Sequence, residues 1–510
     1  MGVSLTARQL IGLLVDPGSY RGWDEPSTPT TTDAEYRGAL TRARERTGVD
    51  EAVLTGAARI GGQAVALVAS EFGFLGGSIG VATAERITQA VERATAERLP
   101  LVALPVSGGT RMQEGSAAFL CMLRITAAVQ AHRAAGLPYL SYLRNPTMGG
   151  VFASWGTLGQ LVFAEPGARL GFLGPRVYEE LRGVELPADV QRAETLAERG
   201  LVDAVVAPEE LREVLRRSLS VLTRVPLPAV VPPPVPASSP RPDAWDAVLR
   251  TRRPDRPGTR ELLRRTTEEL VLLDAPGGRG GALVRALAVL NGQPAVVVGQ
   301  QRQAGDVERP FTAADLRAVR RTARLAEQLR LPLVTVVDTA GAELSVQAEL
   351  DGIAIEIAHC LTTLLALRTP VLAVLLGQGS GGGALALLPA DHVLAASNAW
   401  LAPLPPEGAS AIVHRDGAHA PDLARSQGIT AHDLAAVGLV DQVIPELPDA
   451  ADEPAAFCTR LGDAIGTTLA TLTATPTPSL LHARATRHRR LGDHKISHLS
   501  AITDTNHPKE

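Results

Sequence analysis

The stretch GQGSGGGALAL, residues 377–387, follows the apolar run PVLAVLL and precedes a segment that is typical of a helix. Its glycines at 377, 379 and 382 satisfy G-x-G-x-x-G, the loop that holds a pyrophosphate in dinucleotide-binding folds. Such folds require an acidic residue about 20 positions later, at the end of the next strand. Here Asp391 precedes the next apolar run, VLAAS, and Asn398 and Ala399 follow it. The sequence therefore indicates another use for these glycines.

The chain contains the pattern around this loop twice. GGQAVALVAS (61–70) matches NGQPAVVVGQ (291–300), and each is followed by a helical stretch rich in Ala and Arg. The later pairs keep the same order: LPLVALPVSGGT (99–110) with LPLVTVVDTAGA (331–342), VFAEPGARLGFLGP (162–175) with VLAASNAWLAPLPP (393–406), and GLVDAVV (200–206) with GLVDQVI (438–444). Short apolar runs alternate with longer helical patterns, which predicts an α/β fold in each half. The sequence thus predicts a duplicated domain.

A proline-rich segment, RVPLPAVVPPPVPASSPRP (224–242), separates the two halves and is typical of an extended linker. We therefore divide the chain into an N-terminal domain over residues 1–225, a linker over 226–242, a C-terminal domain over 243–475 and a basic tail over 476–510. The tail includes LLHARATRHRRLGDHKISH, which we expect to form a solvated basic helix because it has no metal-ligand spacing such as H-E-x-x-H.

The composition excludes several classes of protein. The chain has 510 residues, 45% of them hydrophobic, and a net charge of −4, which is typical of a soluble globular protein rather than of a nucleic-acid-binding surface. No apolar stretch reaches the roughly 20 residues that a membrane span needs, and the start lacks a signal-peptide cleavage site. Three distant cysteines, Cys121, Cys360 and Cys458, exclude a disulfide framework and a C-x-x-C zinc site. We expect a cytoplasmic protein without a metal.

Lysine occurs only at Lys495 and Lys509, both in the tail. A phosphate-binding Walker A loop needs G-K-[ST], and a Schiff-base enzyme needs a lysine in its core, so neither is possible here. The same argument excludes a covalently attached biotin or lipoyl group in a folded carrier domain of this chain. Any such carrier must be a separate polypeptide.

Four glycine-rich loops follow predicted strands: FLGGSIG (74–80), VSGGTRMQEG (106–115), NPTMGGVFAS (145–154) and GQGSGGGALAL. Where such a loop opens a helix, its first N–H groups have no internal partner and can hold a phosphate or a developing oxyanion. The alternative is that paired glycines only permit tight turns. Ser107 and Ser380 do not fall in G-x-S-x-G, so a hydrolase nucleophile is not indicated. Glu114 and Glu407 are candidate acids or bases, or side chains that brace their loops.

These motifs resemble the carboxyltransferase of bacterial acetyl-CoA carboxylase. Residues 1 to about 225 are similar to its β subunit, through ARQLIGLLVDPGSY, EFGFLGGSIG, SGGTRMQEG, NPTMGGVFAS, AEPGARLGFLGPRV and GLVD. Residues 243 to about 446 are similar to its α subunit, through AWDAVLRTRRPDRP, LAEQLRLPLVTVVDTAGA, GQGSGGGALAL, LPPEGASAI and ITAHDLAAVGLVDQVIPE. The two related subunits look fused in the order β then α, which agrees with the repeat.

The resemblance implies two tandem crotonase-like domains, each a ββα superhelix. It implies that the N-terminal half binds an acyl-CoA such as acetyl-CoA and that the C-terminal half binds carboxybiotin. The site then forms between the first half of one protomer and the second half of another, in a homodimer or a larger oligomer. Biotin carboxylase and a separate biotin carboxyl carrier protein are the implied partners, and malonyl-CoA for fatty-acid synthesis or a related polyketide precursor is the implied product.

The resemblance also implies residue roles. Two negative oxygens develop in the reaction, one on the thioester enolate and one on the ureido group of biotin, and backbone amides can stabilise both. We expect Gly108 and Gly109 to hold the enolate, and Gly382 and Gly383 to hold the ureido oxygen. Substrate-binding or wall-forming roles are expected for a further set: Phe74, Gly76, Gly77, Arg111, Gly149, Gly150, Gly379 and Gly381. Arg111 is expected to bind CoA or to brace its loop.

The chain departs from the family pattern at several positions. It lacks the four-cysteine zinc ribbon that often opens the β subunit, and it lacks the glycine–histidine stretch that follows GLVD in the α subunit. Gln378 replaces a glutamate, Ala340 a proline, Ser345 a glycine and Asn145 an acid. These changes leave the acyl substrate open. Two other functions also remain open: a biotin-independent malonyl-thioester decarboxylase or acyl-transfer enzyme on the same fold, and a non-catalytic subunit that binds a carrier.

Overall fold

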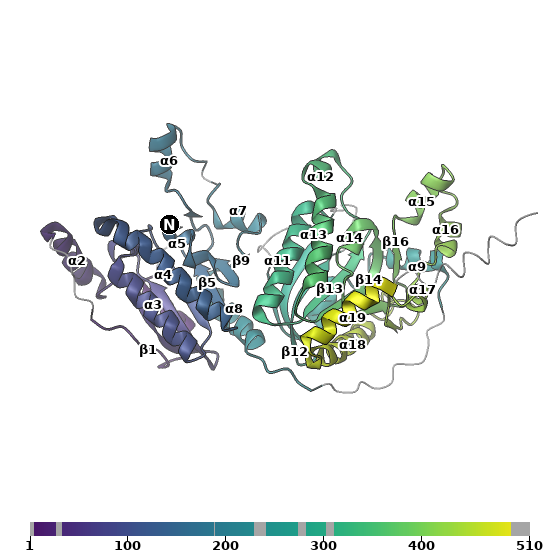
Figure 1. The fold of residues 1–510 in the computed structure, drawn as a ribbon, viewed down its shortest axis with the longest axis horizontal. Helices are drawn as coiled ribbons and strands as arrows, with labels where there is room; N and C mark the ends of the chain where they lie inside the picture. The colour runs from purple at the N-terminus through teal and green to yellow at the C-terminus, as the bar shows by residue number, and fades with distance from the viewer. Residues whose placement is uncertain are drawn as a thin grey trace, which may run out of the picture. The chain divides into compact units, whose positions relative to one another are not determined.

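The computed structural model describes residues 5–26, 33–187, 189–228, 241–273, 282–301 and 311–490. Of the described residues, one compact unit holds those up to Thr223 together with Leu273, and the second unit holds the others (Figure 1). Most of the predicted linker, residues 229–240, lies outside the described residues. The predicted domain limits otherwise stay a prediction.

The first unit is built on a seven-stranded sheet with the order β1-β2-β3-β4-β5-β7-β9. Its first three strands pair antiparallel, and from β3 onward every pair is parallel. The central strands β3 and β4 are rich in Val, Leu and Ala, β5 reads YLSYL, and all three are buried on both faces, as is expected of a sheet covered on both sides. The strand bounds are β1 Arg21–Gly22, β2 Val53–Ile60, β3 Gln63–Ser70, β4 Leu101–Leu104, β5 Tyr139–Leu143, β7 Leu161–Ala164 and β9 Ala204–Val205.

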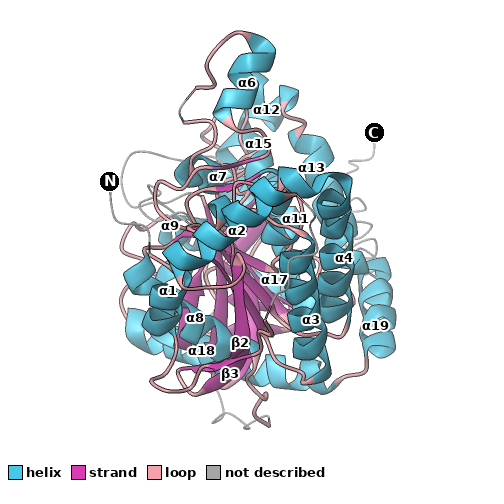
Figure 2. Ribbon diagram, turned by 90° about the vertical axis from the view of Figure 1, so that its left-hand side faces the viewer, coloured by secondary structure: helices cyan, strands magenta, loops and turns pink. Residues whose placement is uncertain are grey.

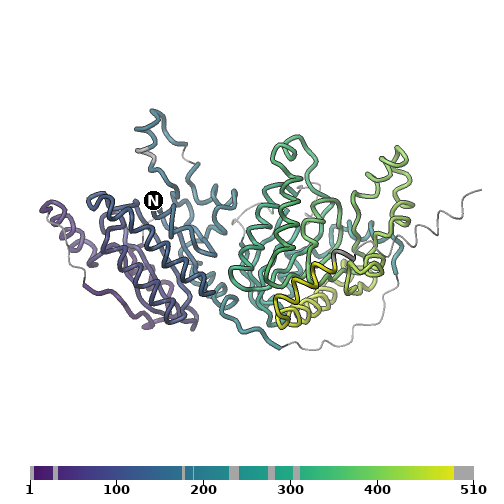
Figure 3. The backbone as a smooth tube through the Cα atoms, in the orientation of Figure 1, coloured from purple at the N-terminus to yellow at the C-terminus, as the bar shows by residue number. Residues whose placement is uncertain are grey.

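Helices cover both faces of this sheet. Helices α3 and α4 pack side by side along one face, and α1 and α8 lie against the other (Figure 2). The helix bounds are α1 Ala7–Leu14, α2 Ala34–Thr47, α3 Val81–Ala96, α4 Gly115–Ala134, α5 Gly149–Phe152, α6 Pro175–Arg182, α7 Ala193–Glu198 and α8 Pro208–Leu222, with 3₁₀ turns η1 Leu75–Gly77, η2 Met112–Glu114 and η3 Trp155–Thr157. Helix α6 lies in the segment between β8 and α7, which extends away from the rest of the first unit (Figure 3).

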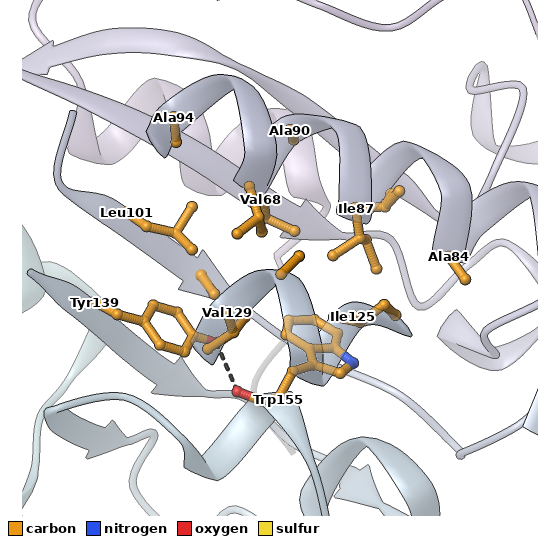
Figure 4. Close-up of a cluster of buried hydrophobic side chains, with 14 of the residues drawn as sticks. Val68, Ala84, Ile87, Ala90, Ala94, Leu101, Ile125, Val129, Tyr139 and Trp155 are labelled. Carbon is orange, nitrogen blue, oxygen red and sulfur yellow. Dashed lines mark hydrogen bonds between the residues drawn. The ribbon is translucent and has the colours of Figure 1, made fainter. Parts of the chain in front are cut away.

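The core between the sheet and α3–α4 fixes the segment that follows α5. Val68, Ile87 and Ile125 are fully buried there together with Tyr139 and Trp155 (Figure 4). The Tyr139 hydroxyl donates a 2.6 Å hydrogen bond to the carbonyl of Trp155, which begins η3. Since η3 directly follows α5, this buried bond ties the end of that short helix segment to the sheet.

A short second layer of pairing connects the loops at the carboxyl ends of the parallel strands. Strands β6 (Thr147–Met148) and β8 (Leu170–Gly171) pair in parallel. Single bridges join Ser107 to Thr147 and Ile79 to Thr110. The glycine-rich loops of the first half are therefore hydrogen-bonded neighbours, although they lie far apart in the sequence.

The second unit repeats this plan with an eight-stranded sheet, in the order β10-β11-β12-β13-β14-β15-β17, and with β16 paired to the end of β14. The pairing of residues between neighbouring strands is also repeated in the second unit. The hairpin pair Ile60–Gln63 corresponds to Leu290–Gln293, and the Ser107–Thr147 bridge corresponds to the Thr339–Gly379 pair. The strand bounds are β10 Thr267–Leu272, β11 Leu283–Leu290, β12 Gln293–Gln300, β13 Leu333–Thr339, β14 Val371–Ser380, β15 His392–Ala396, β16 Trp400–Ala402 and β17 Gln442–Ile444. The predicted duplication is confirmed.

In the second unit α11 and α13 pack together as α3 and α4 do in the first. The helix bounds are α9 Ala244–Thr251, α10 Thr259–Thr266, α11 Ala313–Leu329, α12 Val346–Leu350, α13 Ile353–Ala366, α14 Gly381–Leu385, α15 Pro406–Val413, α16 Ala420–Ser426, α17 Ala431–Ala436, α18 Pro454–Ala474 and α19 Thr477–Arg490. Among the described residues, no helix combines the length and apolar character that a membrane crossing requires.

Helix α19 corrects the prediction that the basic tail is solvated. Arg484 is 1% exposed, and its guanidinium donates to both oxygens of Asp391, at 2.9 and 2.6 Å. It also donates to the carbonyls of Leu364 and Leu367, each at 2.8 Å. These bonds give the buried charge of Arg484 the partners that it needs. They anchor the helix 477–490 to the rest of the second unit. Residues 491–510 lie outside the described residues.

Candidate active site

Three glycine-rich loops of the first unit are joined by backbone hydrogen bonds. The Gly108 N–H donates to the carbonyl of Gly76 at 2.8 Å, and the Ile79 N–H donates to that of Gly109 at 2.9 Å. On its other side, the Ser107 N–H donates to Pro146 at 2.8 Å, and the Met148 N–H donates back to Ser107 at 2.9 Å. The loop 106–111 is therefore fixed from both sides.

Two glycines of these loops are required by their backbone conformation, and Gly77 is required by close approach as well. A Cβ on Gly77 would lie 2.1 Å from the carbonyl oxygen of Val106, and its φ is +63°. A Cβ on Gly149 would lie 3.4 Å from the Cα of Gly109, and its φ is +59°. Both conformations are in the left-handed region, which strains residues with a side chain. The predicted wall-forming glycines of these loops thus lie together.

The structure gives Gly108 and Gly109 hydrogen-bond acceptors of their own. The Gly109 N–H donates to the Ser107 hydroxyl at 3.0 Å, and that hydroxyl donates to the carbonyl of Gly109 at 3.3 Å. The Gly108 N–H is bonded to Gly76, as described above. The enolate role predicted for these two amides therefore requires both bonds to break. Ser107 is fully buried and closes its own loop, as expected for a residue that is not a nucleophile.

Helix α5 begins at Gly149 and offers free amides instead. We use the name first cradle for the N–H groups of its second and third residues, Gly150 and Val151. Neither donates to a loop carbonyl or a side chain among the described residues, as helix geometry requires of the first turn. The N–H of Gly149 instead continues the β6–β8 ladder. A Cβ on Gly150 would lie 3.2 Å from the Thr110 hydroxyl and 3.4 Å from Met122, so glycine at this position allows α5 to pack closely against both side chains.

Arg111 and Phe74 are buried in the wall behind this site. Arg111 is 1% exposed, and its Nη2 lies 2.5 Å from Glu51 and 2.9 Å from the carbonyl of Ser78. Burial works to lower the pKa of Arg111, but the hydrogen bond and charge of Glu51 outweigh it and raise that pKa. The Phe74 ring is also fully buried, with the guanidinium stacked 5.6 Å from its centroid. Of the two expected roles of Arg111, bracing agrees with these contacts.

Glu114 and Glu407 also brace their loops. Glu114 accepts hydrogen bonds from the N–H of Val81, at the start of α3, and from the Tyr36 hydroxyl. Glu407 pairs with both terminal nitrogens of Arg252, at 2.6 and 3.0 Å, and this pairing lowers its pKa. Neither carboxylate is therefore placed as a free general base.

The second unit has an equivalent cradle at the end of β14. We use the name second cradle for the N–H groups of Gly382 and Gly383, the second and third residues of α14, which donate to no loop carbonyl or side chain among the described residues. Gly381 has a φ of +63°, and a Cβ on Gly382 would lie 2.6 Å from Cδ1 of Ile357. Gly379 precedes them in β14, where a Cβ would lie 2.7 Å from the carbonyl of Trp400. The four predicted glycines of this loop thus lie together.

The duplication identifies which amides are equivalent. Gly341 repeats the loop closure of Gly109, since its N–H donates to Thr339 at 3.1 Å and the Thr339 hydroxyl donates back at 3.0 Å. The start of α14 repeats the start of α5, with φ of +63° at Gly381 and +59° at Gly149. The equivalent of the second cradle is therefore the first cradle, and not the pair Gly108–Gly109. The repeat itself, aligned at LPLVALPVSGGT (99–110) and LPLVTVVDTAGA (331–342) and counted forward, is the sequence signal that could have located the first cradle.

Two of the family departures have structural partners. The Asn145 side chain accepts a 3.0 Å bond from the Arg169 N–H, and the Ser345 hydroxyl caps α12 by accepting from Ala348 at 3.0 Å. Both positions therefore serve the local backbone. Within the described ranges no three His, Cys, Asp or Glu side chains are grouped to hold a metal ion.

Two copies of one α/β plan, each with a glycine-led helix start at the end of a strand, agree with the predicted crotonase-type fold. The chain belongs to the carboxyl transferase family: the family profile described as "Carboxyl transferase domain" matches residues 3–479. The predicted resemblance is thereby confirmed, and the chain is an enzyme of this class.

Relatives support this assignment over the full length. A Mycobacterium bovis protein named "Probable biotin-dependent acyl-coenzyme A carboxylase beta3 subunit" is 55% identical, over 96% of this chain and 99% of the relative. The "Acetyl-coenzyme A carboxylase carboxyl transferase subunits beta/alpha" of Salinispora tropica is 41% identical, over 96% of this chain and 91% of the relative. Among solved structures, the transcarboxylase 12S hexamer core with hydrolysed methylmalonyl-coenzyme A has a TM-score of 0.71 at 24% identity, covering 90% of this chain and 89% of the other. That structure supports the fold, including the predicted crotonase type.

Proposed function

We propose that this chain transfers a carboxyl group from carboxybiotin, held on a separate carrier protein, to the α-carbon of an acyl-CoA. The observation that carries the proposal is the pair of equivalent cradles, one in each half of a carboxyl transferase family member. Acetyl-CoA giving malonyl-CoA, or a related acyl thioester giving its carboxylated product, is the substrate class that we propose. The relatives' names, which specify biotin dependence and acyl-coenzyme A, support this choice.

In this proposal the first cradle stabilises the thioester enolate. Its N–H groups are fixed by the loop contacts described above and have no competing acceptor. Backbone amides that are already oriented stabilise a developing oxyanion without changing protonation state, and one such donor contributes about 10²–10³ in rate. Gly108 and Gly109 support this cradle from behind, through the contact between Gly109 and Gly149.

The second cradle fits the ureido oxygen of biotin. Carboxybiotin would supply the carboxyl group, and its ureido nitrogen would take up the proton that the α-carbon of the acyl thioester loses, so that the ring ends neutral. The chain supplies the N–H groups of Gly382 and Gly383, which lie in the first turn of α14, where a Cβ at Gly382 would contact Ile357. These amides orient the ring and stabilise negative charge on its oxygen. No lysine lies among residues 1–494, so the carrier with its attached biotin must be another polypeptide.

We further propose that a second copy of the chain completes the site. Exposed apolar side chains lie beside the glycine loops at corresponding positions of the two halves: Met112 and Leu123 in the first, Leu344 and Ile355 in the second. Large apolar surfaces of this kind mark association sites. Replacing Leu123 by Glu should shift the protein towards monomer in analytical ultracentrifugation and abolish carboxyl transfer, whereas Leu227→Glu, at another exposed apolar position, should do neither.

The reverse reaction tests the proposed function. Purified protein would be mixed with malonyl-CoA or methylmalonyl-CoA, with and without biocytin, and loss of the carboxyl group followed. Loss that depends on biocytin is the expected result. Loss without biocytin would contradict the proposal and favour a decarboxylase, and no loss with any acyl-CoA would favour the non-catalytic, carrier-binding alternative.

A further inference from the structure

Gln300, the last residue of β12, connects the second cradle to the sheet. Its side chain is 2% exposed. The amide nitrogen Nε2 donates a 2.8 Å hydrogen bond to the carbonyl of Gly383, and the oxygen Oε1 accepts a 3.2 Å bond from the N–H of Asp338. Gln300 therefore joins α14 to the end of the neighbouring strand β13.

The Gly383 carbonyl needs this donor because the helix does not provide one. In a regular helix it would accept from the N–H of Leu387, but that N–H donates to Ala384 at 3.1 Å. The preceding carbonyl, Gly382, does receive its helical bond, from Ala386 at 3.0 Å. Three successive glycines are also a poor helix former, so α14 depends on outside contacts for its shape. Gln300 supplies the missing bond to the carbonyl of Gly383, the third residue of α14.

The first unit has no such connection. The position equivalent to Gln300 in the repeat is Ser70, whose hydroxyl is buried and has no hydrogen-bond partner among the described residues. The start of α5 is instead held by the backbone bonds around Ser107. We use the name amide clamp for the two hydrogen bonds of the Gln300 side chain, to Gly383 and from Asp338. Among the described residues the clamp occurs in the second half alone, so the shared fold does not require it.

We infer that Gln300 is a positioning residue, which holds the amides of the second cradle where they meet the biotin-derived oxygen. The inference rests on the proposed function. Groups that stabilise a transition state must be held to within about 0.5 Å, and a displacement of about 1 Å costs about 10²-fold in rate. Loss of the clamp should therefore lower turnover of the biotin-dependent step and leave binding of the acyl thioester unchanged.

The experiment compares two buried glutamines of the same strand. Gln300→Leu removes the clamp, while Gln293→Leu removes the amide at the opposite end of β12, where Nε2 donates to Leu227 and the side chain is likewise 2% exposed. Gln300→Glu keeps the shape and the acceptor for Asp338 but, as a carboxylate, cannot donate to Gly383. Full-length variants would be assayed for biocytin-dependent loss of the carboxyl group of malonyl-CoA. Thermal unfolding and the KM for malonyl-CoA would be measured in parallel.

We expect kcat to fall by about 10- to 100-fold in both Gln300 variants, with KM for malonyl-CoA and CoA affinity within about twofold of the parent protein. Gln293→Leu should keep kcat although its unfolding temperature falls. Equal loss of kcat in Gln300→Leu and Gln293→Leu, or a Gln300→Glu variant as fast as the parent, would overturn the inference while leaving the proposed function intact. Absence of biocytin-dependent activity in the parent protein would overturn both.

Discussion

Replacing Gly150 by Pro removes one N–H from the first cradle with little change in backbone shape. Gly150 is the second residue of α5, where proline is tolerated because the N–H has no helical acceptor and the φ of the ring suits a helix. If this N–H donates to the enolate, its loss should lower kcat by about 10²–10³-fold, or about 2.7–4 kcal/mol of transition-state stabilisation. The assay is biocytin-dependent loss of the carboxyl group of malonyl-CoA under saturating conditions.

The matched control is Gly150→Ala, which keeps the N–H and adds a similar Cβ. That Cβ would lie 3.2 Å from the Thr110 hydroxyl and 3.4 Å from Cγ of Met122, both side-chain atoms that can move slightly. We expect the alanine variant to lose less than about tenfold, since small core overpacking costs about 1 kcal/mol. A Gly150→Pro enzyme that turns over within about threefold of Gly150→Ala would refute the assignment of this amide as an oxyanion donor. Equal thermal stability of the two variants would exclude an effect of unfolding.

Further predictions concern the walls and the buried charges. Gly77→Ala should lower kcat more than tenfold, because its Cβ would lie 2.1 Å from a backbone carbonyl. Gly76→Ala has the same left-handed strain of about 1 kcal/mol but no atom within 4 Å of its Cβ, so its loss of kcat should be much smaller. Steady-state kinetics of both variants check this. Arg111→Met should cost about 3–5 kcal/mol in denaturant unfolding, because it leaves a carboxylate buried without its partner, while KM for acyl-CoA in the folded fraction stays near that of the parent. Burial works to raise the pKa of Glu446, but the hydrogen bond and charge of Arg256 lower that pKa below 4.5. The contribution of the Glu446 carboxylate to the free energy of unfolding is therefore complete above pH 4.5 and is lost as the pH falls through the lowered pKa. The free energy of unfolding lost in Glu446→Gln should accordingly shrink below pH 4.5, as denaturant titrations over a pH series would show.

The elements that repeat in the sequence could be predicted from it, whereas the partners of single amides could not. The match of GGQAVALVAS with NGQPAVVVGQ predicts the hairpins β2–β3 and β11–β12, because apolar runs separated by a glycine turn permit little else. The paired glycines of SGGTR look as suitable for an oxyanion as those of TMGGV when only the sequence is considered. The structure separates them, since the N–H groups of Gly108 and Gly109 have loop acceptors and those of Gly150 and Val151 do not.

The fate of charged side chains was also decided by the fold. Arg484 lies in a basic segment whose composition indicates solvent exposure, yet it is buried against Asp391, nearly a hundred residues earlier in the chain. Arg111 stands beside a glycine loop, where a substrate contact is reasonable, yet Glu51 and the carbonyl of Ser78 occupy its guanidinium. A sequence pattern describes a residue's neighbours in the chain, and these partners are neighbours only in space.

The sequence by itself determined the duplicated α/β plan and the carboxyl transferase family, because these depend on periodicity and long motifs, and it predicts a separate carrier, because lysine is absent from residues 1–494. The tertiary structure decided which amides are free, which glycines are required by close contact and that Gln300 holds the start of α14. The physical reason is that a hydrogen bond is made or left unmade by distances of a few tenths of an ångström between segments far apart in the chain. Local sequence preferences act within a few residues and do not set those distances.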